Sequence, residues 1–449
     1  MGTLFGTDGI RGDANRYPMD GMTAFSVGQA VAHLMKGKGT RPRIIIGRDT
    51  RISGPMLEHS LAAGIASMGG EAYLTGVLPT PGVASICRSM AANAGIVISA
   101  SHNPYEDNGI KVFSGNGFKL SDAQEESIET LVLNGQLMDM TPPARDMGQV
   151  TTLEGALDMY VDFLKSCFPG DLCMKGMKIV LDTANGATFQ AAPALFASLG
   201  ANVDILHNRP DGTNINLSCG SQFTQDLQRH VSRRGAAIGL AFDGDGDRLI
   251  AVDETGRAIT GDRSMLVCAL DLKAQGRLKN DQVVSTVMSN LGFAAACRKY
   301  GVRHHASRVG DRYVVEDMKR LGAVVGGEDS GHLIFLEHHT TGDGIIAGLQ
   351  LIAAMLRQNK PLSELADMMT VYPQALINVD VERKPAISTL PRVAAAIVEA
   401  EAALGHEGRV LVRYSGTQNL CRVMVEGPTP QITKKYCTQI AEAVKRETR

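Results

Sequence analysis

The sequence predicts an α/β protein in which one strand–helix–strand plan occurs three times and a smaller α+β region follows. Each of the three segments has an apolar strand, a polar loop, an alanine-rich helix, a glycine and a second short strand. The glycine after each helix is an expected stop, because glycine adopts the left-handed conformation without a Cβ penalty. Continuous apolar strands alternating with helices indicate parallel sheets covered by helices. A spacing of roughly 100–130 residues between the segments favours three copies of one domain over unrelated strand–helix units.

The expected elements follow the same order in every segment. As strand, helix and strand they are 43–49, 55–67 and 71–74 in the first segment, 178–183, 190–199 and 201–205 in the second, and 282–286, 292–300 and 302–305 in the third. The last ~80 residues differ, because their strands alternate apolar and polar residues, which predicts a small α+β domain with an antiparallel sheet. Its expected strands are 375–381, 409–413 and 421–426, and its expected helices are 393–404 and 433–445.

Composition excludes several classes of protein. The chain has 449 residues, enough for about two to four domains, and 44% of them are hydrophobic, as in a folded protein with ample core. A net charge of −2 gives no basic excess that would attract nucleic acid or an anionic membrane.

The cysteines and the N-terminus indicate a compartment. The eight cysteines form no C-x-x-C pair and no zinc-finger spacing, so we interpret them as reduced core residues. The N-terminus lacks the pattern of a signal peptide, and no stretch approaches the ~18 apolar residues of a membrane helix. We therefore expect a cytoplasmic protein.

Ser101 follows a short apolar strand, 95–98, and we expect it to be exposed at the corner. Asn103-Pro104 prevents a helix from starting directly after it. A serine hydroxyl on such a corner can carry a covalent group into and out of a cleft. Alone it is weak evidence, since most Ser-His neighbours are ordinary loop residues. Adjacent side chains seldom pair as nucleophile and base, but His102 is kept with Ser101 as a candidate catalytic residue.

An acidic run begins about 140 residues later, with Asp243, Asp245 and Asp247 separated by glycines. Such spacing lets three carboxylates turn toward one point, which suits Mg²⁺ shared with a phosphate. A calcium loop is one alternative, and Glu254 falls at its twelfth position, but Arg248 replaces the glycine at its sixth and the flanks read as strands. A solvated acidic turn is the other. Together with the serine, the run predicts phosphoryl transfer, and Arg248 is a candidate substrate-binding residue.

Cationic residues elsewhere complete the candidate catalytic set. Lys111 lies on one face of an alternating strand, residues 108–113. It is interpreted as a general acid or base, or as a cation holding an attacked hydroxyl, and the alternative is a solvated strand lysine. Arg11 is a further catalytic candidate, and residues 308–311 are expected to line the cleft. Weaker candidates are Arg48 and Arg51.

Two polar loops are typical of ligand binding, and each is otherwise a polar turn between strands. Residues 326–332 offer the carboxylate, hydroxyl and imidazole that bind sugar hydroxyls, through Glu328, Ser330 and His332. A second loop offers arginine, hydroxyls and exposed N–H groups to a phosphate. Its candidate residues are Arg413, Ser415, Gly416, Thr417 and Arg422. The adjacent pair His338-His339 projects in two directions, so we expect it at the surface.

Taken in order, these motifs resemble the α-D-phosphohexomutase superfamily, and within it the branch that acts on glucosamine phosphates. The resemblance covers essentially the whole chain, and the ordered set is far more specific than any one motif. The stretches that carry it are FGTDGIRG at 5–12, SASHNP at 99–104, DGDGDR at 243–248, VGDRYV at 309–314, GEDSGH at 327–332, TTGDG at 340–344 and RYSGT at 413–417.

The resemblance implies three similar mixed-sheet α/β domains plus a smaller C-terminal α+β domain around a central cleft. We place them at 1–150, 151–255, 256–371 and 372–449, carrying in turn the phosphoserine, metal-binding, sugar-binding and phosphate-binding loops.

The resemblance also implies that Ser101 is carried as phosphoserine, with a single Mg²⁺ between that phosphate and Asp243, Asp245 and Asp247. The implied reaction interconverts glucosamine 6-phosphate and glucosamine 1-phosphate through the 1,6-bisphosphate, for UDP-N-acetylglucosamine and cell-wall synthesis. Alternatives are a phosphomannomutase or phosphoglucomutase, a Mg²⁺-dependent sugar phosphatase, and a non-catalytic sugar-phosphate binder. The expected partner is a small sugar phosphate, without nucleic acid or membrane, and a homodimer stays open.

Overall fold

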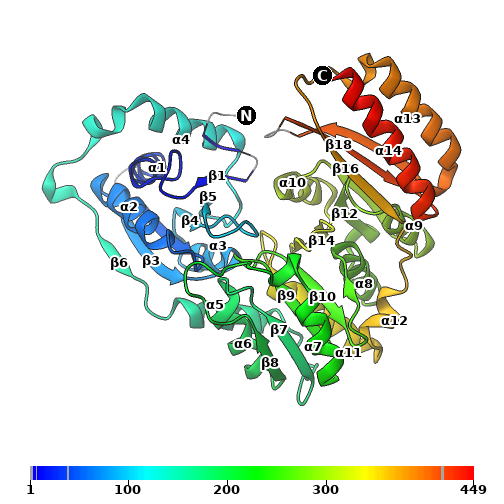
Figure 1. The fold of residues 1–449 in the computed structure, drawn as a ribbon. Helices are drawn as coiled ribbons and strands as arrows, with labels where there is room; N and C mark the ends of the chain where they lie inside the picture. Colours follow the sequence, from blue (N-terminus) through cyan, green and yellow to red (C-terminus); the bar gives the residue numbers. More distant parts are fainter. Residues whose placement is uncertain (1–3, 7, 38–39, 416–418, 449) are drawn as a thin grey trace. The chain divides into compact units, whose positions relative to one another are not determined.

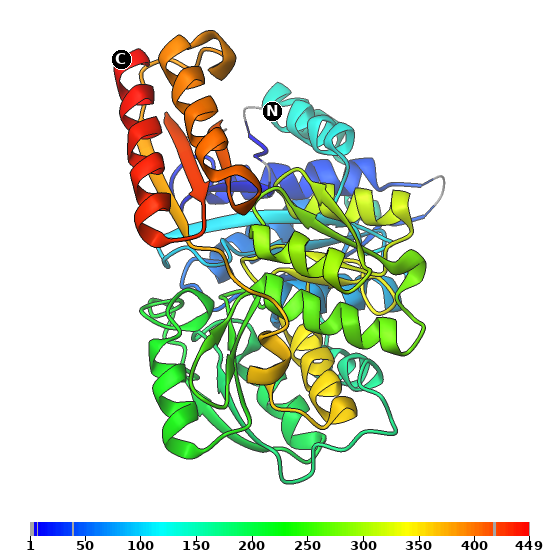
Figure 2. The same cartoon turned by 90° about the vertical axis from the view of Figure 1, so that its right-hand side faces the viewer.

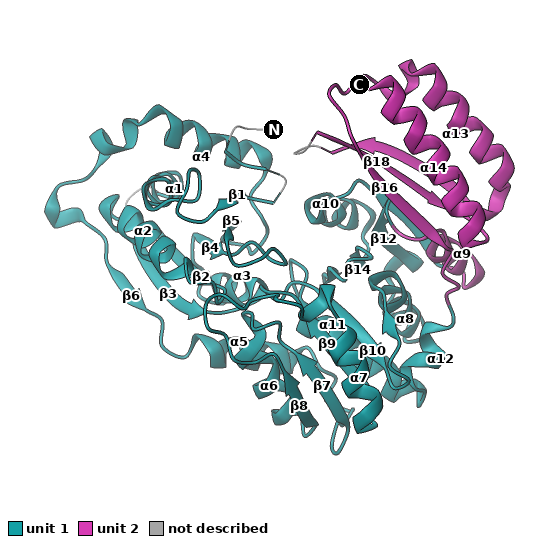
Figure 3. Ribbon diagram, viewed as in Figure 1, with its two compact units in different colours: residues 1–288, 302–368 teal, residues 289–301, 369–449 magenta. Residues whose placement is uncertain are grey.

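The structure is a computed structural model that describes residues 4–6, 8–37, 40–415 and 419–448. It divides into two compact units (Figure 3). Unit 1 comprises residues 1–288 and 302–368 and contains three sheets, and unit 2 comprises residues 289–301 and 369–449 and contains one. Within the described ranges, every helix is too short or too polar to cross a membrane.

The first sheet has six strands in the order β1-β5-β4-β2-β3-β6 (Figure 1). Strands β4, β2, β3 and β6 are parallel, whereas β5 is antiparallel to both of its neighbours. Its strands are β1 (Ile10–Asp13), β2 (Arg43–Arg48), β3 (Glu71–Val77), β4 (Ala94–Ile98), β5 (Asp107–Ser114) and β6 (Val150–Thr152). Its helices are α1 (Gly21–Leu34), α2 (Gly54–Ser67), α3 (Thr80–Ser89) and α4 (Asp122–Asn134), followed by the 3₁₀ turns η1 (Gln136–Met140) and η2 (Ala144–Asp146).

The second sheet has the order β11-β10-β9-β7-β8 and the third the order β13-β12-β14-β15. The second contains β7 (Lys178–Asp182), β8 (Asn202–Leu206), β9 (Ile238–Phe242), β10 (Leu249–Asp253) and β11 (Ala258–Ile259), with α5 (Ala156–Ser166), α6 (Thr188–Ser198), η3 (Gly220–Gln222) and α7 (Gln225–Arg234). The third contains β12 (Gln282–Thr286), β13 (Arg303–Ser307), β14 (Val325–Gly327) and β15 (Leu333–Phe335), with α8 (Gly261–Ala274), η4 (Lys279–Asp281), α10 (Asp311–Leu321), α11 (Gly344–Gln358) and α12 (Leu362–Ala366).

One topology is common to the three sheets. Each has a four-strand core in which the first strand lies between the second and the third, and the fourth strand pairs with the third: β3-β2-β4-β5, β8-β7-β9-β10 and β13-β12-β14-β15. The first three strands are parallel and the fourth is antiparallel. The prediction of three similar mixed-sheet domains is therefore confirmed, and the antiparallel fourth strand is what makes each of these sheets mixed.

The predicted helix stops are also confirmed. Helices α2, α6 and the later α9 (Leu291–Lys299) are each followed by a glycine with positive φ: +85° at Gly69, +87° at Gly200 and +66° at Gly301. Strand β4 is buried along its whole length, as expected of a strand covered on both faces.

Unit 2 has a three-stranded antiparallel sheet in the order β16-β18-β17, and the small α+β domain is confirmed. Its elements are β16 (Gln374–Asp380), β17 (Arg409–Tyr414) and β18 (Leu420–Glu426), with η5 (Ile387–Thr389), α13 (Pro391–Leu404), η6 (Gly405–Glu407) and α14 (Pro430–Glu447). Helices α13 and α14 lie side by side against the sheet (Figure 2, orange and red). Val423 of β18 and Cys437 and Ile440 of α14 are fully buried in the core that the helices and the sheet share.

Helix α9 also belongs to unit 2, although it lies in the third repeated segment of the sequence. Glu426 at the end of β18 is fully buried, and its carboxylate accepts a hydrogen bond from the backbone N–H of Leu291, at 2.9 Å. Arg409 donates to the same carboxylate at 2.7 Å. A buried carboxylate therefore anchors the first turn of α9, which has its positive dipole end there.

Helices α1 and α2 approach so closely that glycine is needed on both. A Cβ on Gly64 would overlap the carbonyl oxygen of Phe25, and one on Gly28 would overlap that of Leu61. Gly64→Ala is expected to lower the free energy of unfolding by about 1–3 kcal/mol, because the helices must move apart. Thermal unfolding would measure this, with Gly170→Ala as control, since nothing lies within 4 Å of a Cβ at Gly170. Equal stability of the two variants would contradict the prediction.

Candidate active site

Three loops of unit 1 meet at one place, and each leaves the same position in its sheet. They are residues 99–106 between β4 and β5, residues 243–248 between β9 and β10, and residues 328–332 between β14 and β15. In every case the loop joins the third strand of the common topology to the fourth. Ser101, the aspartates and the sugar-binding candidates are therefore brought together by three equivalent connections.

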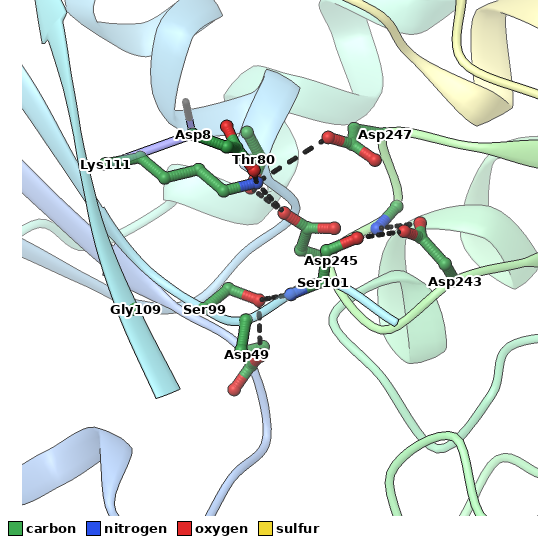
Figure 4. A network of polar contacts seen from close by, with 12 residues as sticks. Asp8, Asp49, Thr80, Ser99, Ser101, Gly109, Lys111, Asp243, Asp245 and Asp247 are labelled. Carbon is green, nitrogen blue, oxygen red and sulfur yellow. Dashed lines mark hydrogen bonds and ion pairs between the residues drawn. The ribbon is translucent and has the colours of Figure 1, made fainter. Parts of the chain in front are cut away.

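Ser101 lies at the centre of this site (Figure 4). Its Oγ donates a hydrogen bond to Asp243 Oδ2 at 2.6 Å and lies 3.2 Å from Nδ1 of His102. The residue has a left-handed backbone, with φ +53°, and is only 1% exposed. The expectation of an exposed serine is thus wrong, because loops from the other sheets cover the corner.

The three aspartates are buried, with exposures of 1% at Asp243, 1% at Asp245 and 5% at Asp247. One carboxylate oxygen of each aspartate lies within 4.8 Å of those of the other two. Asp243 Oδ1 accepts hydrogen bonds from the backbone N–H groups of Gly246 and Arg248, at 3.1 and 3.2 Å. Burial, and then the charges of Asp247 and Asp245, raise the pKa of Asp243 well above its usual range. A solvated acidic turn is therefore wrong, and the flanking strands exclude a helix–loop–helix calcium site.

The triad fits a hard divalent cation. Asp245 Oδ2 accepts a hydrogen bond from Thr80 Oγ1 at 2.7 Å, which orients that carboxylate. Across the described part of the chain, Asp245 Oδ1 and Asp247 Oδ1 are buried without a hydrogen-bond donor. Buried carboxylate oxygens need a partner, and Mg²⁺ prefers such ligands. The triad is a candidate metal site.

Lys111 reaches this triad from β5. Its Nζ lies 2.9 Å from Asp245 Oδ2, 3.3 Å from Asp8 Oδ2 and 3.7 Å from Asp247 Oδ2, and the residue is 2% exposed. Burial alone would lower the pKa of Lys111, but Asp245, Asp8 and Asp247 outweigh burial and raise it. The alternative of a solvated strand lysine is wrong, and the buried ammonium is a donor and a counter-charge.

A network of charges continues from Lys111 along the site. Asp8 pairs with Arg11 and with Lys119, and Lys119 Nζ lies 2.5 Å from Asp311 Oδ2. Arg11 Nη1 also donates to the carbonyl oxygen of Ala100 at 3.2 Å. The structure thus places Arg11 and Asp311 at the site, as expected. It adds Asp8, which lies in the 5–12 motif, and Lys119, for which the sequence gives no signal.

The sugar-binding candidates of the third sheet take different environments. Glu328 Oε1 accepts a hydrogen bond from the backbone N–H of Gly310 at 3.1 Å, while Ser330 is exposed. His332 is 3% exposed and lies between two carboxylates, 3.6 Å from Asp247 and 3.8 Å from Asp311. The loop therefore offers the exposed Ser330 hydroxyl beside the Glu328 carboxylate, which is oriented by its hydrogen bond from Gly310.

Arg248 and His102 flank the serine and the triad. Arg248 Nε lies 3.9 Å from Asp243 Oδ2 and 3.8 Å from Asp247 Oδ1. Burial, followed by the charges of Arg248 and Arg11, lowers the pKa of His102 to about 4. His102 is therefore neutral at pH 7, and its ring can accept or relay a proton but is a weak base.

The phosphate-binding candidates lie in unit 2, at the β17–β18 hairpin. Arg413 and Arg422 face each other as cross-strand partners, and the carbonyl oxygen of Ser415 accepts a hydrogen bond from Lys384 at 2.9 Å. Like charges directly opposite are unfavourable unless an anion lies nearby, so the pair favours an anionic ligand. The remaining candidates, Gly416 and Thr417, lie outside the described residues.

His339 and most of the cysteines are buried. His339 is 1% exposed, its Nε2 lies 2.8 Å from the carbonyl oxygen of Pro81, and burial lowers its pKa to about 4. The surface expectation is therefore wrong for His339, whose ring packs edge-on against Phe163 at an interplanar angle of 68°. All eight cysteines are free; seven of them are buried, as expected of core residues, and the expectation is wrong for Cys173, which is exposed.

Models of the phosphoglucomutase/phosphomannomutase family match four consecutive parts of the chain. Its alpha/beta/alpha domains I, II and III match residues 2–138, 158–256 and 260–372, and its C-terminal domain matches residues 376–443. A phosphoglucosamine mutase of Syntrophobacter fumaroxidans is 67% identical over 445 residues, which are 99% of each chain.

Two solved structures share the fold. A phosphoglucomutase/phosphomannomutase family protein from Burkholderia thailandensis matches with a TM-score of 0.78 and 23% identity, over 98% of this chain and 97% of that one. The N-acetylphosphoglucosamine mutase of Aspergillus fumigatus, in complex with GlcNAc-6P and magnesium, matches with a TM-score of 0.71 and 16% identity, over 99% and 96% of the two chains.

Proposed function

This chain belongs to the phosphoglucosamine mutases of the phosphoglucomutase/phosphomannomutase family, and we propose that it works through a phosphorylated Ser101. The reaction interconverts glucosamine 6-phosphate and glucosamine 1-phosphate. The observation that carries the serine's role is its hydrogen bond of 2.6 Å to Asp243, because it puts a nucleophilic oxygen beside a carboxylate triad. A phosphoryl group on that oxygen would stand next to the triad.

Asp243, Asp245 and Asp247 would hold Mg²⁺, the ion bound by the Aspergillus mutase. The ion would supply positive charge at the transferring phosphoryl group, where phosphoryl transfer depends on electrostatics and positioning. The ammonium of Lys111 adds a second positive charge beside the same carboxylates.

The chemistry requires two transfers. In the first, the bond from phosphorus to Ser101 Oγ breaks, a bond from phosphorus to the sugar O1 forms, and the proton of the sugar hydroxyl ends on Oγ. The product is glucosamine 1,6-bisphosphate. In the second, the 6-phosphoryl group passes to Ser101 Oγ, and the serine proton ends on the sugar O6. We assign the movement of these protons to Lys111 and His102, with Arg11 holding the loop at Ala100.

Substrate binding would be shared by the loop at 328–332 and the hairpin between β17 and β18. Glu328, Ser330 and His332 would bind sugar hydroxyls, and Arg248 would contact the transferred phosphate. The second phosphate would bind Arg413, Ser415, Gly416, Thr417 and Arg422. Since the bisphosphate must turn over between the transfers, this loop must accept either end of the sugar.

The family matches support the proposed domains 1–150, 151–255, 256–371 and 372–449. We place the reaction in the cytoplasm, on the route to UDP-N-acetylglucosamine and the cell wall, in keeping with eight free thiols.

A rate comparison tests this function. Purified protein loaded with glucose 1,6-bisphosphate and Mg²⁺ should turn over glucosamine 6-phosphate with a higher kcat/KM than mannose or glucose 6-phosphate. Removal of divalent ions by EDTA should lower kcat by about 10²-fold or more, since metal charge contributes several kcal/mol at the transition state. A mannose or glucose preference would overturn the glucosamine assignment. Release of inorganic phosphate without sugar 1-phosphate would indicate a phosphatase.

A further inference from the structure

The backbone of the Ser101 loop turns its carbonyl oxygens toward the protein, and one side chain collects them. The guanidinium of Arg51 is completely buried. It donates hydrogen bonds to the carbonyl oxygens of Ser101 at 3.0 Å, Asn103 at 2.9 Å and Asp107 at 2.9 Å, and also to that of Pro104. A single cation therefore fixes the loop from its nucleophile to the start of β5.

Arg51 is held in turn by Asp49, and Asp49 reaches the serine by a second path. Asp49 Oδ2 accepts hydrogen bonds from Arg51 Nε at 2.8 Å and from Ser99 Oγ at 2.5 Å. Ser99 Oγ accepts one from the backbone N–H of Ser101 at 2.9 Å (Figure 4). The C=O of Ser101 bonds directly to Arg51, and its N–H reaches Asp49 through the Ser99 hydroxyl. Both backbone groups are therefore held by the buried Asp49–Arg51 ion pair.

The loop between β8 and η3 contributes a second contact to the same carbonyl oxygens. Asn216 Nδ2 donates to the carbonyl oxygens of Ser101 at 2.8 Å and Asn103 at 3.0 Å. The Ser101 carbonyl oxygen therefore accepts from Arg51, which follows β2 of the first sheet, and from Asn216, in the loop after β8 of the second sheet. This arrangement joins the serine loop to the sheet that carries the aspartates.

We propose that Arg51 is a positioning residue for phosphoryl transfer, acting through the Ser101 loop. The inference rests on the proposed function, since it concerns where Ser101 Oγ stands relative to the triad. Ser101 has φ +53°, a conformation that non-glycine residues seldom adopt, so its surroundings must hold it. Arg51 supplies that restraint while touching neither substrate nor triad.

Geometry makes lysine a poor substitute. The guanidinium is a planar fork with five donors, whereas an ammonium has three donors and no fixed plane. Arg51→Lys keeps the charge next to Asp49 but loses part of the carbonyl contacts. A displacement of the reacting atoms by about 1 Å can lower a rate about 10²-fold.

Arg51→Lys is the first test. We expect kcat for glucosamine 6-phosphate to fall about 10- to 100-fold while KM stays within about threefold, because the substrate-binding residues are untouched. Loading of Ser101 by glucose 1,6-bisphosphate, followed by intact mass, should slow in parallel. Arg357→Lys is the matched control: Arg357 of α11 pairs with Asp271 of α8 at 2.6 Å, and this variant should keep kcat within about twofold.

Two further measurements separate positioning from folding. Millimolar guanidinium should raise kcat of Arg51→Ala at least about tenfold at unchanged circular dichroism, and should not affect wild type. Because Arg51 and Asn216 share the Ser101 carbonyl, Arg51→Lys combined with Asn216→Ala should lose less than the product of the two single losses.

Specific outcomes overturn the inference. They are a kcat within twofold of wild type for Arg51→Lys, or a loss that follows only the folded fraction and is not restored by guanidinium. A wild-type protein without mutase turnover would instead overturn the proposed function, so the two failures are distinguishable.

Discussion

Ser101→Ala is expected to abolish mutase turnover, with kcat lower by on the order of 10⁴-fold or more. The variant has no oxygen to accept or donate the phosphoryl group, and neither the triad nor Lys111 can replace a missing bond partner. Intact mass after incubation with glucose 1,6-bisphosphate should show one added phosphoryl group on the wild type, on the peptide that contains residue 101, and none on the variant.

The fold should survive this change, since Ser101 loses one hydroxyl and Asp243 one donor. Ser89→Ala is a suitable control, because the Ser89 hydroxyl donates within its own helix, to the Ile86 carbonyl oxygen at 3.1 Å. It should retain wild-type kcat. Turnover of Ser101→Ala above about 1% of wild type, or phosphate at another residue, would refute the phosphoserine scheme.

Lys111→Met is expected to damage both stability and activity. Removing one partner of a buried ion pair strands the other, at a cost of about 3–5 kcal/mol, and Lys111 faces Asp245, Asp8 and Asp247 together. In buffer containing EDTA the variant should unfold at a markedly lower temperature than wild type. Saturating Mg²⁺ should restore part of the difference, because a cation bound only by the folded protein stabilises it.

Mutase activity of Lys111→Met should fall by at least about 10²-fold even with Mg²⁺, because the ammonium beside the transferring group is lost. Lys178→Met is the control, since Lys178 is the exposed first residue of β7. It should change neither the unfolding temperature nor kcat beyond small surface effects. A Lys111→Met protein as stable and as active as this control would show that the buried ammonium is dispensable.

The repeated α/β units could be predicted because their signals are local. An apolar strand, a helix and a glycine with positive φ at Gly69 or Gly200 can each be recognised within a few residues. The added edge strands could not be predicted in the same way. Strand β11 has two residues, and β6 has three exposed residues that pair with β3 across more than seventy positions of sequence. Such pairing depends on tertiary packing.

The residues of the candidate site also fall into those that local sequence motifs reveal and those that only the fold brings together. Ser101 and the aspartates stand in compact motifs, so residue type and spacing were enough to predict them as site residues. Lys119 has no such context, and only folding brings its ammonium to Asp8 and Asp311. The high burial of Ser101 and of His339 could not be predicted either, because residues distant in sequence cover them.

The three equivalent connections give the enzyme a separable layout. The proposed nucleophile, metal ligands and sugar-binding residues each follow a different sheet, so an engineer who wants the enzyme to accept a new hexose could randomise the loop at 328–332. Residues 99–106 and 243–248 could be left unchanged. Mass spectrometry of the protein after incubation with glucose 1,6-bisphosphate would check that Ser101 still takes up a phosphoryl group before any new sugar is tried.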